Sequence, residues 1–346
     1  MRGFNTLLFV LFALSANAAD RTVGTVSVQK GNNVSVNGEA PLSLTLDGKD
    51  HQSCQFLSKR APDESHEFTW KEVTTTRGGE LAEMLGDQLR SIDSLVVKGY
   101  VNDKDFHAMW DASLYGYLSV INLKNAVLEN NAVPDTAFFH ESEQYEGSSH
   151  EIFYYIGLRK IILPEGLEKI GEGAFYQASA LRQVNFPSTL RYIGDFAFNA
   201  TKLEMNQLVI PEGVEEINQY AFAFCRKLKA QVILPSTIKK IGEWAFYGCP
   251  ITSINLPEGL ESLGSLAFWD CDLREVSIPS SCHEFNEGWQ FGFNRNLEKM
   301  HLPEGMTEIP DHFAVDCFRL REVNFPHTLK HIGEKAFSLC ISLKNV

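Results

Sequence analysis

The chain has 346 residues, a net charge of −13 and a hydrophobic fraction of 44%. That hydrophobic fraction, over this length, is enough for a large core. An acidic chain without a basic run gives no electrostatic reason to expect nucleic acid or an anionic membrane as a partner.

Residues 1–19 have the pattern of a signal peptide. Arg2 precedes an apolar run from Leu7 to Leu14, and Ala16-Asn17-Ala18 supplies a small-residue cleavage site. The apolar run is too short to cross a bilayer, so the mature chain is expected to have no membrane-spanning segment. We therefore expect an exported protein, at the cell surface or extracellular, with the periplasm as the alternative.

Residues 20–78 form an N-terminal extension. Between Arg21 and Gly48, alternating apolar residues are interrupted by Gly31-Asn32-Asn33 and Asn37-Gly38, which predicts short strands or hairpins. The stretch from His51 to Trp70 has no assignable pattern. An enzymatic hypothesis could rest only on this extension.

Residues 79–157 are predicted to be an irregular cap that covers the first repeat of a solenoid. A polar loop is expected at Glu141–His150, and Val133–Phe138 resembles part of the repeat described below. Apolar spacing predicts two helices and two strands, at Glu80–Arg90, Asp105–Ala112, Ile92–Val97 and Leu118–Leu123.

Residues 158–346 contain eight regular repeats, each marked by a proline 22 to 24 residues from the next. The prolines are Pro164, Pro187, Pro211, Pro235, Pro257, Pro279, Pro303 and Pro326. A mostly aliphatic residue follows three and six positions later, and phenylalanine follows eleven positions later in six repeats. Those phenylalanines are Phe175, Phe198, Phe222, Phe246, Phe268 and Phe337. Their fixed phase predicts one buried ladder of rings.

The last repeat shows how one coil is expected to fold. Leu320-x-x-Val323-x-Phe325 has strand periodicity and ends at Pro326, which cannot donate to a sheet. The chain then crosses back and turns at Gly333, and Glu334–Cys340 is predicted to form one or two helical turns. Stacked coils predict a solenoid with a parallel β-sheet on one face and short helical turns on the other.

Five of the seven cysteines occupy one column, fourteen residues after their proline: Cys225, Cys249, Cys271, Cys317 and Cys340. Ala178 and Thr201 fill the same column in earlier repeats. Because the column accepts any small residue, we expect buried free thiols there rather than disulfides.

The unit L-x-x-I-x-L-P-x-x-L-x-x-I-G-x-x-A-F-x-x-C resembles the BspA-type leucine-rich repeat, closely over Leu158–Val346 and loosely over Gly79–Tyr155. The resemblance implies an exported or surface protein, and several members of that family are adhesins for host extracellular proteins. Repeat six departs from the pattern at Cys282 and Phe285 and carries one extra residue near Trp289, and repeat seven has His312-Phe313-Ala314 in place of Ala-Phe.

Each sequence feature that could indicate catalysis, a cofactor or a metal is explained by the repeat pattern. Gly171-Glu172-Gly173 belongs to the repeat, and His327 and His331 occupy columns filled elsewhere by ordinary polar residues. An acidic residue eight positions after most prolines is explained as the first residue of each helical turn, where the helix dipole favours a carboxylate. No enzyme activity, cofactor or metal is therefore expected.

Two surfaces are candidates for binding. The first is the concave face, lined by outward strand residues: Lys160, Ile162, Gln183, Asn185, Gln207, Gln231, Asn255, Glu275, Ser277, Lys299, His301, Glu322 and Asn324. The second is an aromatic stripe nine and twelve residues after the prolines: Tyr176, Phe196, Tyr220, Trp244, Tyr247, Leu266 and Trp269. The alternative for the stripe is packing of one repeat on the next.

The function expected from the sequence is non-enzymatic binding of an extracellular protein by a solenoid surface, as in a surface adhesin for host or neighbouring-cell proteins. The alternative is a glycan-binding accessory protein whose tryptophan and tyrosine rings stack on sugars. The sequence does not define an oligomeric state.

Overall fold

The computed structural model describes residues 66–139 and 156–344, together with the backbones of five short strands outside these ranges. Those strands are β1 (Gly24–Gln29), β2 (Asn33–Gly38), β3 (Leu44–Leu46), β4 (Gln55–Leu57) and β9 (Ile152–Tyr154). The antiparallel pairing of β1 with β2 confirms a hairpin in the N-terminal extension. The predicted signal peptide, Cys54 and the predicted loop at Glu141–His150 lie outside the described residues.

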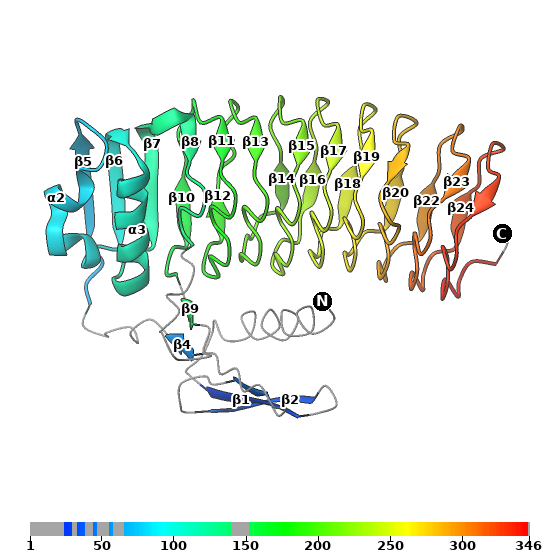
Figure 1. Ribbon diagram of the computed structural model, residues 1–346, viewed down its shortest axis with the longest axis horizontal. Helices are drawn as coiled ribbons and strands as arrows, with labels where there is room; N and C mark the ends of the chain where they lie inside the picture. Colours follow the sequence, from blue (N-terminus) through cyan, green and yellow to red (C-terminus); the bar gives the residue numbers. More distant parts are fainter. Residues whose placement is uncertain are drawn as a thin grey trace.

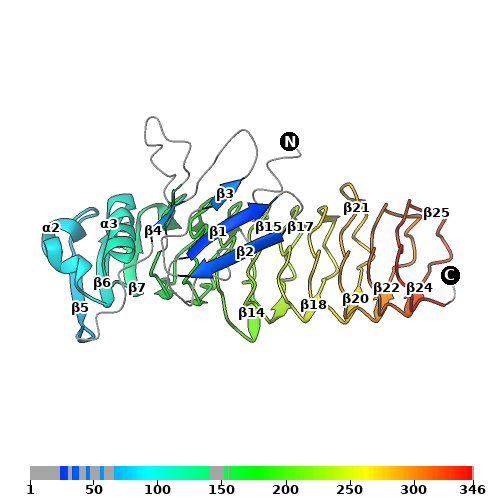
Figure 2. The same ribbon diagram turned by 90° about the horizontal axis from the view of Figure 1, so that it is seen from below.

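The chain forms a solenoid whose coils stack along the long axis, from the cap at one end to the C-terminus at the other (Figures 1 and 2). The first strand of each coil belongs to one row of parallel strands, divided into three sheets. In chain order this row is β5 (Trp70–Thr75), β6 (Ser94–Val101), β7 (Val120–Leu128), β10 (Lys160–Ile162), β12 (Gln183–Val184), β14 (Gln207–Val209), β16 (Gln231–Ile233), β18 (Ser253–Asn255), β20 (Glu275–Ser277), β22 (Lys299–His301) and β24 (Glu322–Asn324).

A second row of short parallel strands runs along another face of the solenoid, where the sequence predicted only a segment that crosses back. It comprises β8 (Ala132–Val133), β11 (Lys169–Ile170), β13 (Tyr192–Ile193), β15 (Glu216–Ile217), β17 (Lys240–Ile241), β19 (Ser262–Leu263), β21 (Glu284–Phe285), β23 (Glu308–Ile309) and β25 (His331–Ile332). Ile193, Ile217 and Ile241 pair in register and are fully buried, because each coil places the same aliphatic position against its neighbour. The parallel-sheet solenoid is thus confirmed, with sheets on two faces.

The segments predicted to be helical turns are successive β-turns, and this part of the prediction is wrong. In the coil around Trp244, the N–H groups of Trp244 and Phe246 donate to Ser265 and Ala267 of the next coil, at 2.9 Å each. Trp244 has a positive φ of 57°. Because alternate N–H groups point along the solenoid axis, the backbone is satisfied between coils rather than within a helix.

The acidic residues that precede these turns therefore do not meet a helix dipole. The Asp195 carboxylate instead accepts a hydrogen bond from the Gln219 backbone N–H of the next coil at 3.0 Å. The Asp135 carboxylate accepts one from the Glu172 N–H at 2.9 Å. At both positions the carboxylate links neighbouring coils.

The phenylalanine ladder is confirmed. Successive rings from Phe138 to Phe291 are fully buried and stacked, with centroids 5.1 to 5.5 Å apart. Phe313 comes from the position of the usual alanine, so its ring meets Phe291 edge-on at 78°. Phe337, in the last coil, is only partly buried.

The cap closes the N-terminal end of the solenoid. α2 (Leu81–Leu85) continues into the 3₁₀ helix η1 (Gly86–Arg90), which together match the predicted first helix. α3 (Asp103–Tyr115) matches the second and starts with a capping box between Asn102 and Asp105. A further 3₁₀ turn, η2, covers Glu129–Asn131. β5 lies within the stretch assigned to the N-terminal extension, yet it pairs with β6 over its whole length.

Six of the seven cysteines are described, and all six are free and buried, in agreement with the prediction. Burial raises the pKa of the Cys249 and Cys271 thiols well above the ordinary value. These groups are neutral, unreactive thiols at physiological pH.

Candidate functional site

A row of bulky, mostly aromatic side chains follows the β-turns along the outside of the solenoid. We call it the aromatic ridge, and it consists of Phe139, Tyr176, Phe196, Tyr220, Trp244, Leu266, Trp269, Trp289 and His312, all partly exposed. The middle of the ridge forms an apolar cluster separate from the main core, packed around the buried residues Ala223, Phe224 and Tyr247. Part of this row therefore packs coil on coil, and part of it faces solvent.

Rings in the middle of the ridge stack on one another. Tyr220 lies between Phe196, at 4.7 Å and 7°, and Trp244, at 5.3 Å and 16°. Tyr247 covers part of Trp244 at 4.4 Å. Both faces of the Tyr220 ring are covered, so this ring offers its edges to a ligand.

The backbone beneath the ridge is in the left-handed region. Phe196, Tyr220, Trp244 and Leu266 have φ values of 55° to 57°, and Trp289 has a φ of 66°. This conformation costs a bulky residue ~1–2 kcal/mol, whereas glycine adopts it freely. Gly173 occupies the same position in the first regular coil with a φ of 58°.

The structure changes the membership of the stripe that the sequence predicted. Tyr247 is only 4% exposed and supports the ridge from below. Trp289 joins the ridge because the extra residue in its coil shifts the frame by one position, and its ring stacks on His312 at 3.8 Å. Phe139 meets Tyr176 edge-on at 4.7 Å. Phe139 could have been found from the sequence, because it directly follows Ala137-Phe138.

The predicted concave face corresponds to the outward side of the first strand row. Of its predicted residues, Lys160, Ile162, Lys299 and His301 are partly exposed and the other nine are exposed. Asn185 spans two coils by bonding the N–H and C=O of Leu163 at 2.7 and 3.0 Å, and Asn324 repeats this at Leu302 at 2.8 and 2.9 Å. These two amides are committed to the solenoid.

Other predicted members of this face contact carboxylates across strands. Lys299 lies 3.2 Å from Glu322, and His301 lies 3.1 Å from Glu275. Gln183 and Asn255 are exposed without belonging to an apolar cluster. Most side chains of this face are polar, but Val209 is 49% exposed and pairs in register with the partly exposed Ile233.

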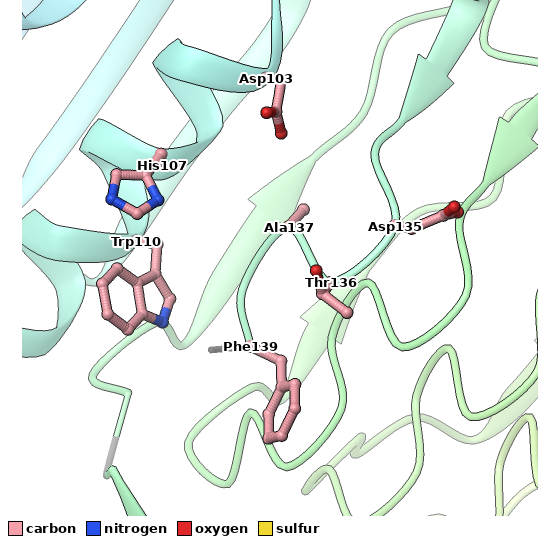
Figure 3. Close-up of a pocket in the computed structure, with 7 residues that line it drawn as sticks. All are labelled: Asp103, His107, Trp110, Asp135, Thr136, Ala137 and Phe139. Atoms are coloured by element: carbon pink, nitrogen blue, oxygen red, sulfur yellow. The ribbon is translucent and has the colours of Figure 1, made fainter. Parts of the chain in front are cut away.

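A pocket of about 450 Å³ lies between α3 and the turn that follows β8, at the N-terminal end of the ridge (Figure 3). Its lining residues are Asp103, His107, Trp110, Asp135, Thr136, Ala137 and Phe139. The Trp110 ring is 8% exposed and lies 5.4 Å from the His107 ring. This pocket could not be predicted from the sequence, because its walls come from two segments that only the stacking of the cap on the first coil brings together.

Within residues 66–139 and 156–344, no group of three or more His, Cys, Asp or Glu side chains could hold a metal ion. In the same part of the chain, none of the helices has the length and apolarity needed to cross a membrane.

A family model described as the BspA type leucine rich repeat region matches residues 148–233 and 230–344, with six copies. No curated protein matches the chain.

Solved structures of other leucine-rich repeat proteins are similar to this one. A leucine-rich repeat protein from Bacteroides ovatus is 18% identical, with a TM-score of 0.43 over 95% of this chain and 82% of that one. The T. pallidum leucine-rich repeat protein is 27% identical, with a TM-score of 0.34 over 40% of this chain and 78% of that one. A leucine-rich cell surface protein from Faecalibacterium prausnitzii is 15% identical, with a TM-score of 0.32 over 95% of this chain and 83% of that one.

Proposed function

This chain belongs to the BspA-type leucine-rich repeat family, and we propose that it is an exported, non-enzymatic recognition protein that binds another protein on its aromatic ridge. Such repeats are typical of cell-surface binding proteins. The proposal extends this to a surface adhesin for a host or neighbouring-cell protein. Its export and its surface location are parts of the same proposal.

One observation carries the choice of surface: bulky apolar residues occupy positive-φ positions at the exposed ridge. Tyr220, Trp244 and Leu266 each keep a large side chain where the backbone favours glycine. Strained residues concentrate at sites of function, and exposed apolar rows on soluble proteins mark interaction surfaces. Stacking offsets some of the strain, at ~0.5–1.5 kcal/mol for each aromatic pair.

The ring geometry favours a protein partner over a glycan. A sugar stacks on an open aromatic face, and the Tyr220 ring has a neighbour on each face. Ring edges beside polar atoms suit the mixed apolar and polar surface of a protein. Burial, with a smaller contribution from Glu243, raises the pKa of Tyr220, so its hydroxyl remains a proton donor at neutral pH.

The test is binding of the purified protein to immobilised extracellular-matrix proteins and, in parallel, to a glycan array. The variant is Trp244→Ala, and the matched control is Trp70→Ala, which removes a tryptophan that is 66% exposed on β5 of the cap. We expect saturable binding to at least one matrix protein and a loss of about tenfold or more for Trp244→Ala, as for an interface hot spot. Trp70→Ala should bind like the wild type.

Two results would overturn the proposal. One is unchanged binding by a Trp244→Ala variant whose unfolding curve shows that it is folded. The other is saturable binding to glycans alone, which would support the alternative of a glycan-binding accessory protein.

A further inference from the structure

The pocket beside α3 is continuous with the aromatic ridge. Thr136 and Phe196 occupy equivalent positions in their coils, because each donates its backbone N–H to a carbonyl group of the next coil. Thr136 donates to Glu172 at 2.7 Å, and Phe196 donates to Gln219 at 3.0 Å. Phe139, which lines the pocket, is also the first ring of the ridge. A partner lying along the ridge would therefore meet the pocket at one end.

The walls of the pocket combine aromatic surface with carboxylates. Trp110 and Phe139 supply the rings, from α3 and from the turn after β8 respectively, and Asp103 supplies an exposed carboxylate (Figure 3). The Asp135 carboxylate is already engaged by the next coil, because Lys169 lies 3.3 Å from it and the Glu172 N–H donates to it. Neither lysine nor arginine is among the lining residues.

The start of α3 does not favour an anion in this pocket, because its own side chains already satisfy that helix end. Asn102 Oδ1 accepts from the Lys104 N–H at 3.1 Å. The buried Asp105 carboxylate accepts from the N–H groups of Gly79, Leu81 and Asn102 at 2.6 to 3.0 Å. The net charge of the lining is negative.

The same sign of charge continues beside the ridge. The residue before each ridge position is acidic in most coils: Asp135, Glu172, Asp195, Glu243, Asp311 and Glu334. Glu172, Asp311 and Glu334 are exposed. An acidic row beside a row of rings attracts a basic partner and repels an acidic one.

We propose that the pocket binds a positively charged side chain, lysine or arginine, of the protein that lies on the ridge. The ammonium or guanidinium group pairs with the Asp103 carboxylate, and the aliphatic stem packs against Trp110 and Phe139. The inference takes its partner from the proposed function, but its test does not depend on that partner.

The test uses Nα-acetyl-arginine amide as the probe and its neutral isostere, Nα-acetyl-citrulline amide, as the ligand control. Binding is followed at constant pH by fluorine NMR of the full chain labelled with 5-fluorotryptophan, with the Trp110 signal assigned by Trp110→Phe. We expect a saturable shift of the Trp110 signal with the arginine probe and none with citrulline. Asp103→Asn should weaken the arginine effect about tenfold, as for loss of a charge-assisted hydrogen bond, whereas Asp87→Asn, at an exposed carboxylate of η1, should not.

The outcomes separate this inference from the proposed function. A Trp110 shift that is equal for arginine and citrulline, absent for both, or unaffected by Asp103→Asn would overturn the cation site and leave the ridge proposal standing. An arginine response that persists in Trp244→Ala, in a variant that still captures its matrix protein, would support the pocket while overturning the ridge.

Discussion

The thiol of Cys249 lies 2.9 Å from the carbonyl oxygen of Phe222 in the preceding coil. The other cysteines of this column repeat the contact, with Sγ–O distances of 3.1 to 3.3 Å. In repeat six the Asn294 amide takes the same role, 2.7 Å from the Phe268 carbonyl. The column therefore selects a small residue, and at most of its positions also a donor that joins neighbouring coils.

Removing that donor should destabilise the solenoid more than replacing it. Cys249→Ala leaves the second acceptor site of the Phe222 carbonyl buried and unpaired, at an expected cost of about 1–3 kcal/mol. Cys249→Ser keeps an O–H donor and should cost less. Urea unfolding of the two variants measures the difference, and equal destabilisation would show that only the size of the side chain matters.

The Cys282 thiol should make the free energy of unfolding depend on pH in the alkaline range. Burial, with a smaller contribution from Glu284, raises its pKa from 9.0 to about 12. Between these values the unfolded chain carries a thiolate while the folded chain keeps the proton, so the stabilising contribution of this group is lost as the pH rises through that interval. The free energy of unfolding of the wild type should therefore fall faster than that of Cys282→Ala between pH 8 and pH 10.5. Parallel curves would contradict this.

Truncation of the phenylalanine ladder should depend on position. Phe246 is fully buried between Phe222 and Phe268, with centroid distances of 5.3 and 5.5 Å. Phe246→Ala is expected to cost about 3–5 kcal/mol. Phe337→Ala should cost clearly less, because that ring is only partly buried at the end of the array. Chemical denaturation of both variants checks the order, and a larger cost at Phe337 would be inconsistent with it.

At Trp244, glycine and alanine should have different effects on stability. Both substitutions remove the ring, but glycine also relieves a φ of 57°. We expect Trp244→Gly to be about 1 kcal/mol more stable than Trp244→Ala, with equal loss of partner binding. A less stable glycine variant would indicate that the positive φ at Trp244 does not destabilise the wild type.

After the first strand, the coils carry Pro-Glu-Gly and Pro-Ser/His-Thr/Ser in alternation. Hydrogen bonds join each coil of the first kind to the coil of the second kind that follows it. Thr237 Oγ1 donates to the Val214 carbonyl and accepts from the Gly213 N–H, at 2.9 Å each. Thr237→Val removes both bonds at nearly constant shape and should cost about 1–2 kcal/mol. Thr307→Val, at an exposed threonine, is the control. Thermal unfolding that shows no difference between the two variants would contradict the pairing.

The sequence by itself determined the coil. The spacing of proline, isoleucine and phenylalanine states which residues of one coil point inward, and neighbouring coils with the same spacing must stack. The buried isoleucines, the stacked rings from Phe175 to Phe268 and the free cysteines all followed from this pattern. The hairpin of β1 and β2 followed in the same way from local alternation and turn residues.

Only the tertiary structure decided what depends on contacts between coils. The segment around Trp244 was expected to be helical because its spacing fits one or two helical turns, but helices this short are marginal alone. Its N–H groups instead donate to carbonyl groups of the next coil, and these acceptors are within reach only once the coils have stacked. Trp289 lies in the ridge because its coil accommodates one extra residue. Asp103 and Phe139 line the same pocket although they come from separate segments of the chain. Periodicity within one coil carries no information about such contacts, because one of the two groups in each contact lies on another coil.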